Sequence, residues 1–558
     1  MSDTSPKTTL AALAEAETEP AAREAAIPRP FPAASWAWLV PNLTVFISSL
    51  CIMVVELVAG RLIARHVGSS LYTWTSVIGI VLSGIAIGNY VGGRLADRFR
   101  ANEALASLFL LSSGLCLLVP LLNERVGSWT VLREQDWAFR IAIHVFLVFF
   151  PPAAMLGTIS PIAAKMALEL GHETGRTVGS VYSWGAVGSI VGTFVTGYYL
   201  IANLGTITVL LSVAGVLVVM AMFFGAKSML PYFWTGVVVA MLVAARAPWA
   251  WAATAGERLG LRVTPGDETF FVEESNYSAI RVERDYDNPA LRSMTLDYLI
   301  HAYIDMDDPD DLQYEYEDIY AGVTQAAIGT PASGARRALF LGGGGFVFPR
   351  WVLRRWPAMQ IEVAELDPAV TRAAFAAFGL DRATPMKIFN LDARNHVDDL
   401  IQRLGRGEPA GGFDLVYGDA FNHYSPPFHL TTYEFNEKLR RLMSPRGVLL
   451  ANVIDVFKSG KFLGAVVNTI EKTFPHVYVF STSLGGPSDT DSRDTFVVVG
   501  SLRTLPLADF DWAQYSGWLL DQQQLATLRE RSGNLVLTDD FAPVDNLLAP
   551  VIRMAERR

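Results

Sequence analysis

The sequence contains little cysteine and no surplus of positive charge, and each shortage excludes a class of protein. Only two cysteines, Cys51 and Cys116, occur in 558 residues, and both lie inside apolar segments. A disulfide framework and a cysteine zinc site are therefore excluded. The formal net charge of −10 argues against a nucleic-acid partner, because phosphate binding requires a clustered basic surface.

A secretory signal peptide is also lacking. Residues 1–33 are rich in Ala, Glu and Pro and hold no apolar run, whereas a signal peptide combines a basic start with an apolar core. We expect a disordered cytoplasmic tail at these residues. The first membrane segment then serves as an uncleaved anchor.

The remaining sequence divides at one break in composition. Long apolar runs extend to about Trp251, and beyond about Gly256 charged residues recur every few positions. This break and the chain length predict several domains. After the tail we expect a multi-pass α-helical membrane domain, a β-hairpin subdomain with a linker helix, and an α/β Rossmann-like domain with a C-terminal extension. The predicted bounds of these three domains are 34–254, 255–333 and 334–558.

The first half contains about seven segments that could cross a bilayer. A spanning helix needs about 20 mostly apolar residues, and no soluble fold explains so many consecutive runs of this kind. Small residues that recur along two of them, at Gly84 and Gly88 and from Gly185 to Gly192, predict close helix packing. The predicted segments are 38–62, 72–94, 103–122, 139–168, 178–203, 206–225 and 232–252.

Charged residues inside the membrane half allow two interpretations. Glu56 lies within the first segment, and Arg61 and Arg65 follow it. Glu56 could bind a cation in a polar conduit, but we favour a structural Glu–Arg pair, because unpaired charge is penalised in lipid. The joint 92–98 resembles a cytoplasmic loop of major facilitator transporters, which keeps an amine transporter among the alternatives.

The predicted topology contains a conflict. Lys and Arg cluster in the tail, at 94–100 and around 165–176, which predicts a cytoplasmic N-terminus. Seven spans would then deliver the second half to the opposite side, although a domain that uses an intracellular cofactor belongs in the cytoplasm. Either the last segment does not fully span, or the N-terminus is outside, or the count is wrong.

The second half has the pattern of an α/β domain. Alternation of apolar and polar residues predicts strands at 275–282 and 294–304, and residues 312–328 have helical periodicity. From Arg337 onward strands and helices alternate, which predicts βαβ units and a mostly parallel sheet.

The first βαβ unit carries a nucleoside-binding pattern. A strand at 338–341 is followed by the glycines Gly342, Gly343, Gly344 and Gly345, a helix at 347–355 and a strand at 360–364. Glycines let the backbone approach a nucleoside closely. An acid about 20 positions later can hold both ribose hydroxyls, and Glu365 stands there.

Two further predicted strands end in acids. Asp392 and Ala393 follow the strand at 386–391, and Asp419 follows the strand at 413–418. Each acid alone could be a turn or cap residue. Because the carboxyl ends of parallel strands share one edge of the sheet, we expect all three acids to line one crevice.

These motifs resemble the spermidine synthase (polyamine aminopropyltransferase) family, a branch of the class I methyltransferase-like folds. The resemblance covers residues 268–500, and the whole architecture resembles the membrane-fused members of that family. The matching pieces are Leu341 to Gly344, Glu365 to Asp367, Asp392-Ala393, Gly418-Asp419, the hairpin Leu296-Asp297, the helix around Tyr314 to Glu317 and, in the membrane half, Ser69 to Ser76.

The resemblance implies a site for decarboxylated S-adenosylmethionine and an amine. Glu365 would bind the ribose, Asp392 the adenine amino group, and Asp419 would take a proton from the attacking amine. It also implies a substrate-binding set that consists of Tyr277, Asp297, His301, Tyr314 and Asn422.

This sequence departs from the family pattern at the amine side of the site. The family loop usually reads Gly-Gly-Gly-Asp-Gly, and here its Asp is Gly345, followed by Phe346. A second catalytic-loop Asp is Asn422, and two family glutamines are Ser278 and His301. A methyltransferase that uses intact S-adenosylmethionine is therefore the runner-up, because removing a carboxylate relieves repulsion against the donor's own carboxylate.

The remaining expectations concern metals, partners and location. His301, His423 and His429 fit no standard ligand spacing, so we expect no metal. The acids of 537–545 either return to the crevice or cap a turn. By analogy with the family we expect a homodimer. We expect an enzyme of the inner (plasma) membrane, in contact with the bilayer, with a cytoplasmic catalytic domain. The alternatives are an amine transporter with a nucleoside-sensing domain and a catalytically inactive scaffold.

Overall fold

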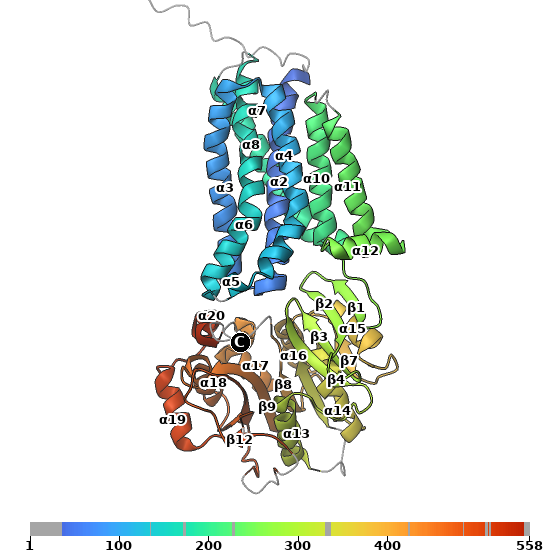
Figure 1. Ribbon diagram of the computed structural model, residues 1–558. Coiled ribbons are helices and arrows are strands. Elements are labelled where there is room, and N and C mark those ends of the chain that lie inside the picture. Colours follow the sequence, from blue (N-terminus) through green and yellow to red (C-terminus); the bar gives the residue numbers. More distant parts are fainter. Residues whose placement is uncertain are drawn as a thin grey trace, which may run out of the picture.

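A helical bundle and an α/β domain are stacked end to end in the computed structural model of the chain (Figure 1). The predicted tail lies outside the residues that the structure describes. The described residues are 36–133, 135–170, 174–225, 229–329, 336–421, 425–483, 485–507, 512 and 515–551.

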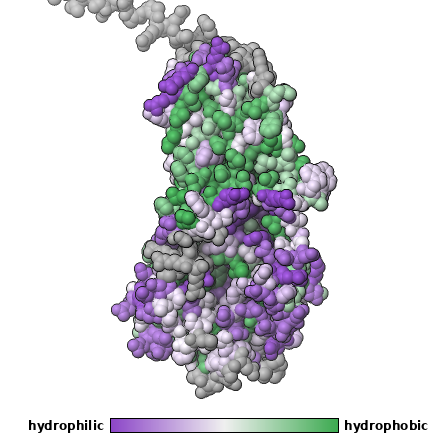
Figure 2. All heavy atoms as spheres, in the orientation of Figure 1, coloured by the Kyte–Doolittle hydropathy of each residue, from purple (hydrophilic) through white to green (hydrophobic). Residues whose placement is uncertain are grey.

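The bundle consists of long apolar helices. Within the described residues, six helical stretches are long and apolar enough to cross a membrane, and a bent pair, α11 with α12, raises that number to seven. The space-filling view shows apolar side chains over most of the visible face of the bundle, above a more hydrophilic α/β domain (Figure 2). The helices are α2 (Trp36–Val67), α3 (Leu71–Arg98), α4 (Ala101–Gly127), α5 (Thr130–Arg133), α6 (Trp137–Gly157), α7 (Ile159–Leu168), α8 (Thr174–Val195), η1 (Thr196–Leu200), α9 (Ile201–Leu204), α10 (Thr206–Phe223), α11 (Leu230–Arg246) and α12 (Ala250–Arg258).

The last predicted segment, 232–252, is not one straight helix. Helix α11 ends at Arg246, and α12 continues at an angle of 104°. The break precedes Pro248, and Ala247 has extended backbone angles of φ −67° and ψ 144°. The ring of a proline disfavours the helical conformation at the residue before it, here Ala247. Helix α12 therefore lies across the end of the bundle (Figure 1).

The glycine stripes pack helices closely, as predicted. A Cβ atom on Gly88 in α3 would lie 2.2 Å from the carbonyl oxygen of Ala154 in α6. A Cβ atom on Gly188 in α8 would lie equally close, 2.2 Å, to the carbonyl oxygen of Phe46 in α2. Larger side chains at these positions would push the helices apart.

The two ends of the bundle differ in what they contact. Helix α2 starts at the end far from the α/β domain, whereas α11 ends beside that domain (Figure 1). The basic joint at 94–100 also lies at the far end, because α3 starts beside the α/β domain and runs away from it. The topology conflict of the sequence is therefore retained in the structure.

The α/β half begins with a four-stranded antiparallel sheet in the order β1-β2-β3-β4. Its strands differ from the prediction, because Ser275 to Ser278 form a turn and the predicted strand at 294–304 is divided at Asp297. The Ser275 hydroxyl accepts hydrogen bonds from the backbone N–H groups of Tyr277 and Ser278, which favours a turn. Asp297 has a positive φ of 56°. The strands are β1 (Thr269–Glu274), β2 (Ala279–Arg284), β3 (Leu291–Leu296) and β4 (Leu299–Asp305), and helix α13 (Glu315–Ile328) follows.

The larger sheet has eight strands in the order β12-β10-β11-β9-β8-β5-β6-β7. The run from β9 to β7 is parallel, and β10, β11 and β12 add to it antiparallel. The sheet is therefore mixed, with a Rossmann-like parallel part. Its strands are β5 (Arg337–Leu341), β6 (Gln360–Ala364), β7 (Lys387–Phe389), β8 (Phe413–Gly418), β9 (Met443–Val456), β10 (His476–Ser481), β11 (Arg493–Ser501) and β12 (Trp518–Leu519).

Helices and short turns connect and cover these strands. The elements after β5 are η2 (Gly344–Phe346), α14 (Val347–Arg355), α15 (Pro368–Ala377), α16 (Ala393–Gly405), η3 (Phe428–Leu430), α17 (Tyr433–Leu442), α18 (Lys461–Glu471), α19 (Gln522–Arg531) and α20 (Val544–Leu547).

Candidate functional site

A cavity of about 530 Å³ lies at the carboxyl edge of the parallel strands, where ligands bind in open α/β sheets. The small antiparallel sheet and the start of α13 close it on one side. The lining residues are Met294, Leu296, Tyr298 to His301, Tyr303, Tyr314, Tyr316, Gly342 to Gly345, Ala364 to Leu366, Val370, Asp392, Ala393, Asp419 to Phe421, Pro427, Leu430, Asn452, Ile454, Arg493 and Thr495.

The glycine loop after β5 forms the floor of the cavity. Gly342 has a φ of 104°, and a Cβ atom there would lie 2.3 Å from the backbone oxygen of Asp419. Gly344 and Gly345 also have positive φ, at 50° and 65°. Only glycine adopts such angles freely, so the loop keeps its backbone exposed to whatever occupies the cavity.

Glu365 is oriented by backbone hydrogen bonds at the end of β6. The N–H of Gly343 donates to one carboxyl oxygen at 2.8 Å, and the N–H of Asp367 donates to the other at 2.8 Å. Burial raises the pKa of Glu365 to about 7. A carboxyl group fixed in this way can accept two further hydrogen bonds, for example from a vicinal diol.

Asp392 caps the N-terminus of α16. Its Oδ1 atom accepts hydrogen bonds from the N–H groups of Arg394 and Asn395 at 2.9 Å and 3.1 Å. Its Oδ2 atom lies 3.0 Å from Nε2 of His429. Asp392 is thus both a cap residue and a lining residue, and Ala393 beside it also lines the cavity.

Asp419 is held at both carboxyl oxygens. The Tyr316 hydroxyl donates to Oδ2 at 2.9 Å, and Nδ2 of Asn452 donates to Oδ1 at 3.0 Å. Burial raises the pKa of Asp419, and these two hydrogen bonds oppose the rise. Burial raises the pKa of Glu317 well above its usual range, and the charge of nearby Asp419 adds to that rise. Asp419 is therefore the carboxyl group of this pair that ionises first.

Some of the predicted substrate residues line the cavity, and others lie elsewhere. His301 and Tyr314 line it, and burial lowers the pKa of His301 to about 4. Tyr277 and Asp297 do not belong to the lining. The backbone oxygen of Tyr277 accepts a hydrogen bond from Arg61 of α2, and Asp297 lines a second cavity together with Arg65 of α2. Asn422 lies outside the described residues, as does His423.

Three residues of the site were not predicted from the sequence. Asn452 interrupts the apolar run of β9, and that interruption was a signal for a special environment. Arg493 begins β11 and reaches the cavity only because β11 pairs beside β9. Tyr316 lies within the family motif at Tyr314 to Glu317, but the sequence did not predict its hydrogen bond to Asp419.

The acids of the C-terminal run form a turn. Thr538 and Phe541 pair across it, and Asp539 accepts hydrogen bonds from Arg394 and Thr432. Of the two interpretations of residues 537–545, acids in the crevice or acids that cap a turn, the turn is confirmed. Asp539 thereby holds Arg394 at the start of α16, next to Asp392.

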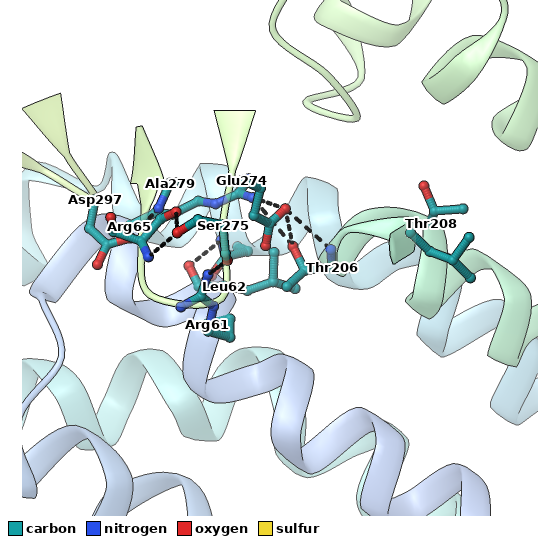
Figure 3. A network of polar contacts seen from close by, with 12 residues as sticks. Arg61, Leu62, Arg65, Thr206, Thr208, Glu274, Ser275, Ala279 and Asp297 are labelled. Carbon is teal, nitrogen blue, oxygen red and sulfur yellow. Dashed lines mark hydrogen bonds and ion pairs between the residues drawn. The ribbon is translucent and has the colours of Figure 1, made fainter. Parts of the chain in front are cut away.

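A polar network ties the bundle to the α/β half (Figure 3). Arg65 in α2 forms an ion pair with Glu274 at 2.9 Å, and Arg61 donates to the backbone oxygens of the turn that begins at Ser275. The preferred pairing of Glu56 with these arginines is therefore wrong, because both arginines bind the α/β half.

The same turn reaches the candidate site. The Ser275 hydroxyl donates to Oδ2 of Asp367 at 2.5 Å, and the N–H of Asp367 donates to Glu365. A chain of hydrogen bonds thus runs from helix α2 of the bundle to the carboxyl group at the end of β6.

The sequence is similar to those of several known proteins. No family model matches the chain. A polyamine aminopropyltransferase of Vibrio vulnificus is 29% identical over 171 residues, which cover 30% of this chain and 52%, about half, of the relative. Polyamine aminopropyltransferase 2 of Streptomyces coelicolor is 23% identical over 417 residues, which cover 73% of this chain and 72% of the relative. The α/β half has fewer residues than that, so the similarity continues into the helical half.

The chain is therefore similar to polyamine aminopropyltransferases, which are transferases, over most of its length. Among solved structures, a probable spermidine synthase of Corynebacterium glutamicum has a TM-score of 0.41 at 22% identity and covers 50% of this chain and 99% of its own.

Proposed function

We propose that this protein is a membrane-bound aminopropyltransferase-like enzyme, which transfers an aminopropyl group from decarboxylated S-adenosylmethionine to an amine. The observation that carries the proposal is the placement of Asp419. Its carboxyl group is fixed by Tyr316 and Asn452 in the same cavity as Glu365 and the glycine loop.

The residues present fit the nucleoside part of the donor. Gly342, Gly343 and Gly344 leave room for a ligand at the backbone, and the oriented carboxyl group of Glu365 suits both ribose hydroxyls. Asp392 is assigned to the adenine amino group. Ala393 beside it would contact the ring.

The chemistry requires alignment and one proton transfer. The sulfonium carbon of the donor is already activated, so catalysis depends on positioning and on an amine that has lost its proton. Asp419 is the acceptor for that proton. An ionised carboxylate also attracts the ammonium form of the substrate and stabilises the positive charge that develops on nitrogen.

The second candidate function is methyl transfer from intact S-adenosylmethionine. Gly345 favours it, because the cavity has no side chain at the position where the family carries an Asp. A Cβ atom at Gly345 would lie 2.9 Å from Phe378 and 3.0 Å from Ala302, so an acid could not be accommodated there without repacking.

The location and the assembly belong to the same proposal. We place the enzyme in the plasma membrane with its α/β half in the cytoplasm, because the donor is an intracellular metabolite. A homodimer remains an expectation by analogy with the family. His301, Tyr314 and Asn422 are assigned to the amine side of the site by the resemblance, and Tyr277 and Asp297 would contribute only indirectly.

The experiment is a comparison of the two donors. Purified full-length protein is titrated with each donor by calorimetry, then incubated with each donor and a panel of amines, and the products are identified by mass spectrometry. The proposal predicts a mass increase of one aminopropyl group. A mass increase of one methyl group, formed only from the intact donor, would favour the second candidate instead.

A further inference from the structure

The two carboxyl oxygens of Asp392 are not equally available to a ligand. Oδ1 accepts hydrogen bonds from the N–H groups of Arg394 and Asn395 at 2.9 Å and 3.1 Å, whereas Oδ2 lies 3.0 Å from Nε2 of His429. An ionised carboxylate has about two lone pairs on each oxygen. Both lone pairs of Oδ1 are therefore occupied, and Oδ2 keeps one. A group in the cavity that donates to Asp392 must use that remaining lone pair.

His429 reaches Asp392 from outside the cavity. Pro427 and Leu430 line the cavity together with Asp392, but His429, between them in the chain, is not among the described lining residues. Because an ionised carboxylate only accepts hydrogen bonds, the hydrogen between the two side chains belongs to Nε2, and His429 donates it. His429 is thus placed to set the rotation of the Asp392 carboxyl group while it leaves the cavity free for a ligand.

The backbone of His429 is held as well. Nη1 of Arg394 donates to the carbonyl oxygen of His429 at 2.7 Å and to Oδ1 of Asp539 at 2.7 Å. The hydroxyl of Thr432, the N-cap residue of α17, donates to the same oxygen of Asp539 at 2.7 Å. Arg394 lies in the first turn of α16, the helix that Asp392 caps. The short turn η3 and the start of α16 therefore form one hydrogen-bonded unit, which places the imidazole against the carboxyl group.

A carboxyl group with a fixed rotation can distinguish two purines. Adenine presents an amino group at position 6 and an acceptor nitrogen at N1, whereas hypoxanthine presents a carbonyl oxygen at position 6 and an N–H at N1. A lone pair directed at position 6 accepts from the amino group and repels the carbonyl oxygen. A carboxyl group that is free to rotate could accept from the N–H at N1 instead, and it would tolerate both bases. A site built to pair with one donor rejects the analogue that lacks it.

We propose that His429 is a positioning residue for the base of the donor: its Nε2–H fixes Oδ2 of Asp392 toward the 6-amino group, so that the site selects a 6-aminopurine over a 6-oxopurine. This inference rests on the proposed function, which assigns Asp392 to the adenine amino group, and it adds the residue that sets base specificity. His429 acts through Asp392 and does not contact the donor. Its effect therefore shows in the preference between two bases and not in the chemical step.

The test uses two thioether nucleosides that differ only in the base, 5′-methylthioadenosine and 5′-methylthioinosine. Their dissociation constants are measured by calorimetry on purified full-length protein. The wild type should bind the adenine compound at least about tenfold more tightly, as an order of magnitude for one hydrogen bond to a charged group. In His429→Ala this preference should fall below about threefold, because the released carboxyl group can accept from the N–H at N1. His429→Gln, whose amide N–H can reach the same oxygen, should restore most of the preference.

Thr431→Ala is the matched control, because the Thr431 hydroxyl donates to the carbonyl oxygen of Phe428 in the same turn and not to Asp392. This control should keep the preference of the wild type. An unchanged preference in His429→Ala, or an equal loss of affinity for both nucleosides, would overturn the inference while leaving the proposed function intact. The same holds if His429→Gln behaves like His429→Ala, or if Thr431→Ala loses the preference too. Failure of the wild type to bind either nucleoside would refute the proposed function and the inference together.

Discussion

Asp419 is the residue on which the chemical argument depends, and its substitution separates catalysis from binding. Asp419→Asn keeps the shape of the side chain but cannot accept a proton. We expect kcat to fall by a factor of about 10² to 10⁴, the usual contribution of a general base, while donor affinity changes by less than about twofold.

Steady-state kinetics and calorimetry on the same preparation check this prediction. Asp414→Asn is the matched control, because Asp414 lies in β8, the strand that ends just before Asp419, but accepts its hydrogen bonds from Arg337 and Ser444, away from the cavity. Equal losses in both variants would indicate damage to the fold instead of loss of the base.

The raised pKa of Glu365 predicts that donor binding depends on pH. Two hydroxyls donate best to an ionised carboxylate, and burial raises the pKa of Glu365 from 4.5 to about 7. Donor affinity should therefore fall about tenfold per pH unit below the pKa. Calorimetry between about pH 6 and pH 8 measures this slope, and Glu365→Gln should bind weakly at every pH. A slope that persists in Glu365→Gln would assign the titration to another group.

The raised pKa of Glu365 also makes the free energy of unfolding depend on pH, in the opposite direction to donor affinity. Because the folded protein holds this proton up to about pH 7 and the unfolded chain releases it near 4.5, the stability that Glu365 contributes is present at low pH. It is lost as the pH rises through the folded pKa.

At the scale of elements, the turn between β1 and β2 links helix α2 of the bundle to Glu365, the residue proposed to bind the nucleoside. Ser275→Ala removes the hydrogen bond to Asp367 and the acceptor for two backbone N–H groups of the turn. At about 1 kcal/mol per hydrogen bond, donor affinity should weaken about fivefold or more. Arg61→Gln should have a similar effect through the same turn.

Calorimetric titration of the donor measures both variants of this turn. The matched control is Arg246→Gln, since Arg246 bonds to Thr208 and Leu204 within the helical half. Weaker binding in the control as well would show that any loss at the base of the bundle is sufficient, and would contradict a specific link through Ser275.

Elements with a simple residue pattern were predictable, and those set by side-chain contacts were not. The strand at 360–364 and the helix at 347–355 have the predicted bounds, because apolar runs and glycines define them. The small sheet was misread where the Ser275 hydroxyl satisfies backbone groups and where Asp297 takes a positive φ and accepts from the N–H of Ala279. Periodicity contains no information on such local bonds.

The candidate site divides in the same way. Glu365, Asp392 and Asp419 end or follow consecutive parallel strands, so their convergence follows from the order of the sheet. Asn452 and Arg493 come from β9 and β11, whose place in the sheet depends on long-range pairing. Their contribution required the structure.

At the scale of the whole molecule, the orientation in the membrane is open to a direct test. The two native cysteines are buried, so a new surface cysteine gives a specific signal. Tyr286, with an exposed fraction of 99%, lies in the α/β half, and Phe99, at 57%, lies at the far end of the bundle. In intact cells a membrane-impermeant maleimide should label Phe99→Cys and spare Tyr286→Cys. The reverse labelling pattern would place the α/β half outside the cell. That is the orientation that the Lys and Arg clusters of the helical half predict.

The central claim is aminopropyl transfer with Asp419 as the base, and it can be tested without knowing the acceptor. Every aminopropyl transfer releases the same thioether, 5′-methylthioadenosine. The decisive measurement is its amine-dependent release from decarboxylated S-adenosylmethionine by the wild-type protein and by Asp419→Asn. The account predicts release by the wild type and a loss of at least about 10² in the variant. Equal release by both proteins would contradict it, as would turnover of intact S-adenosylmethionine alone.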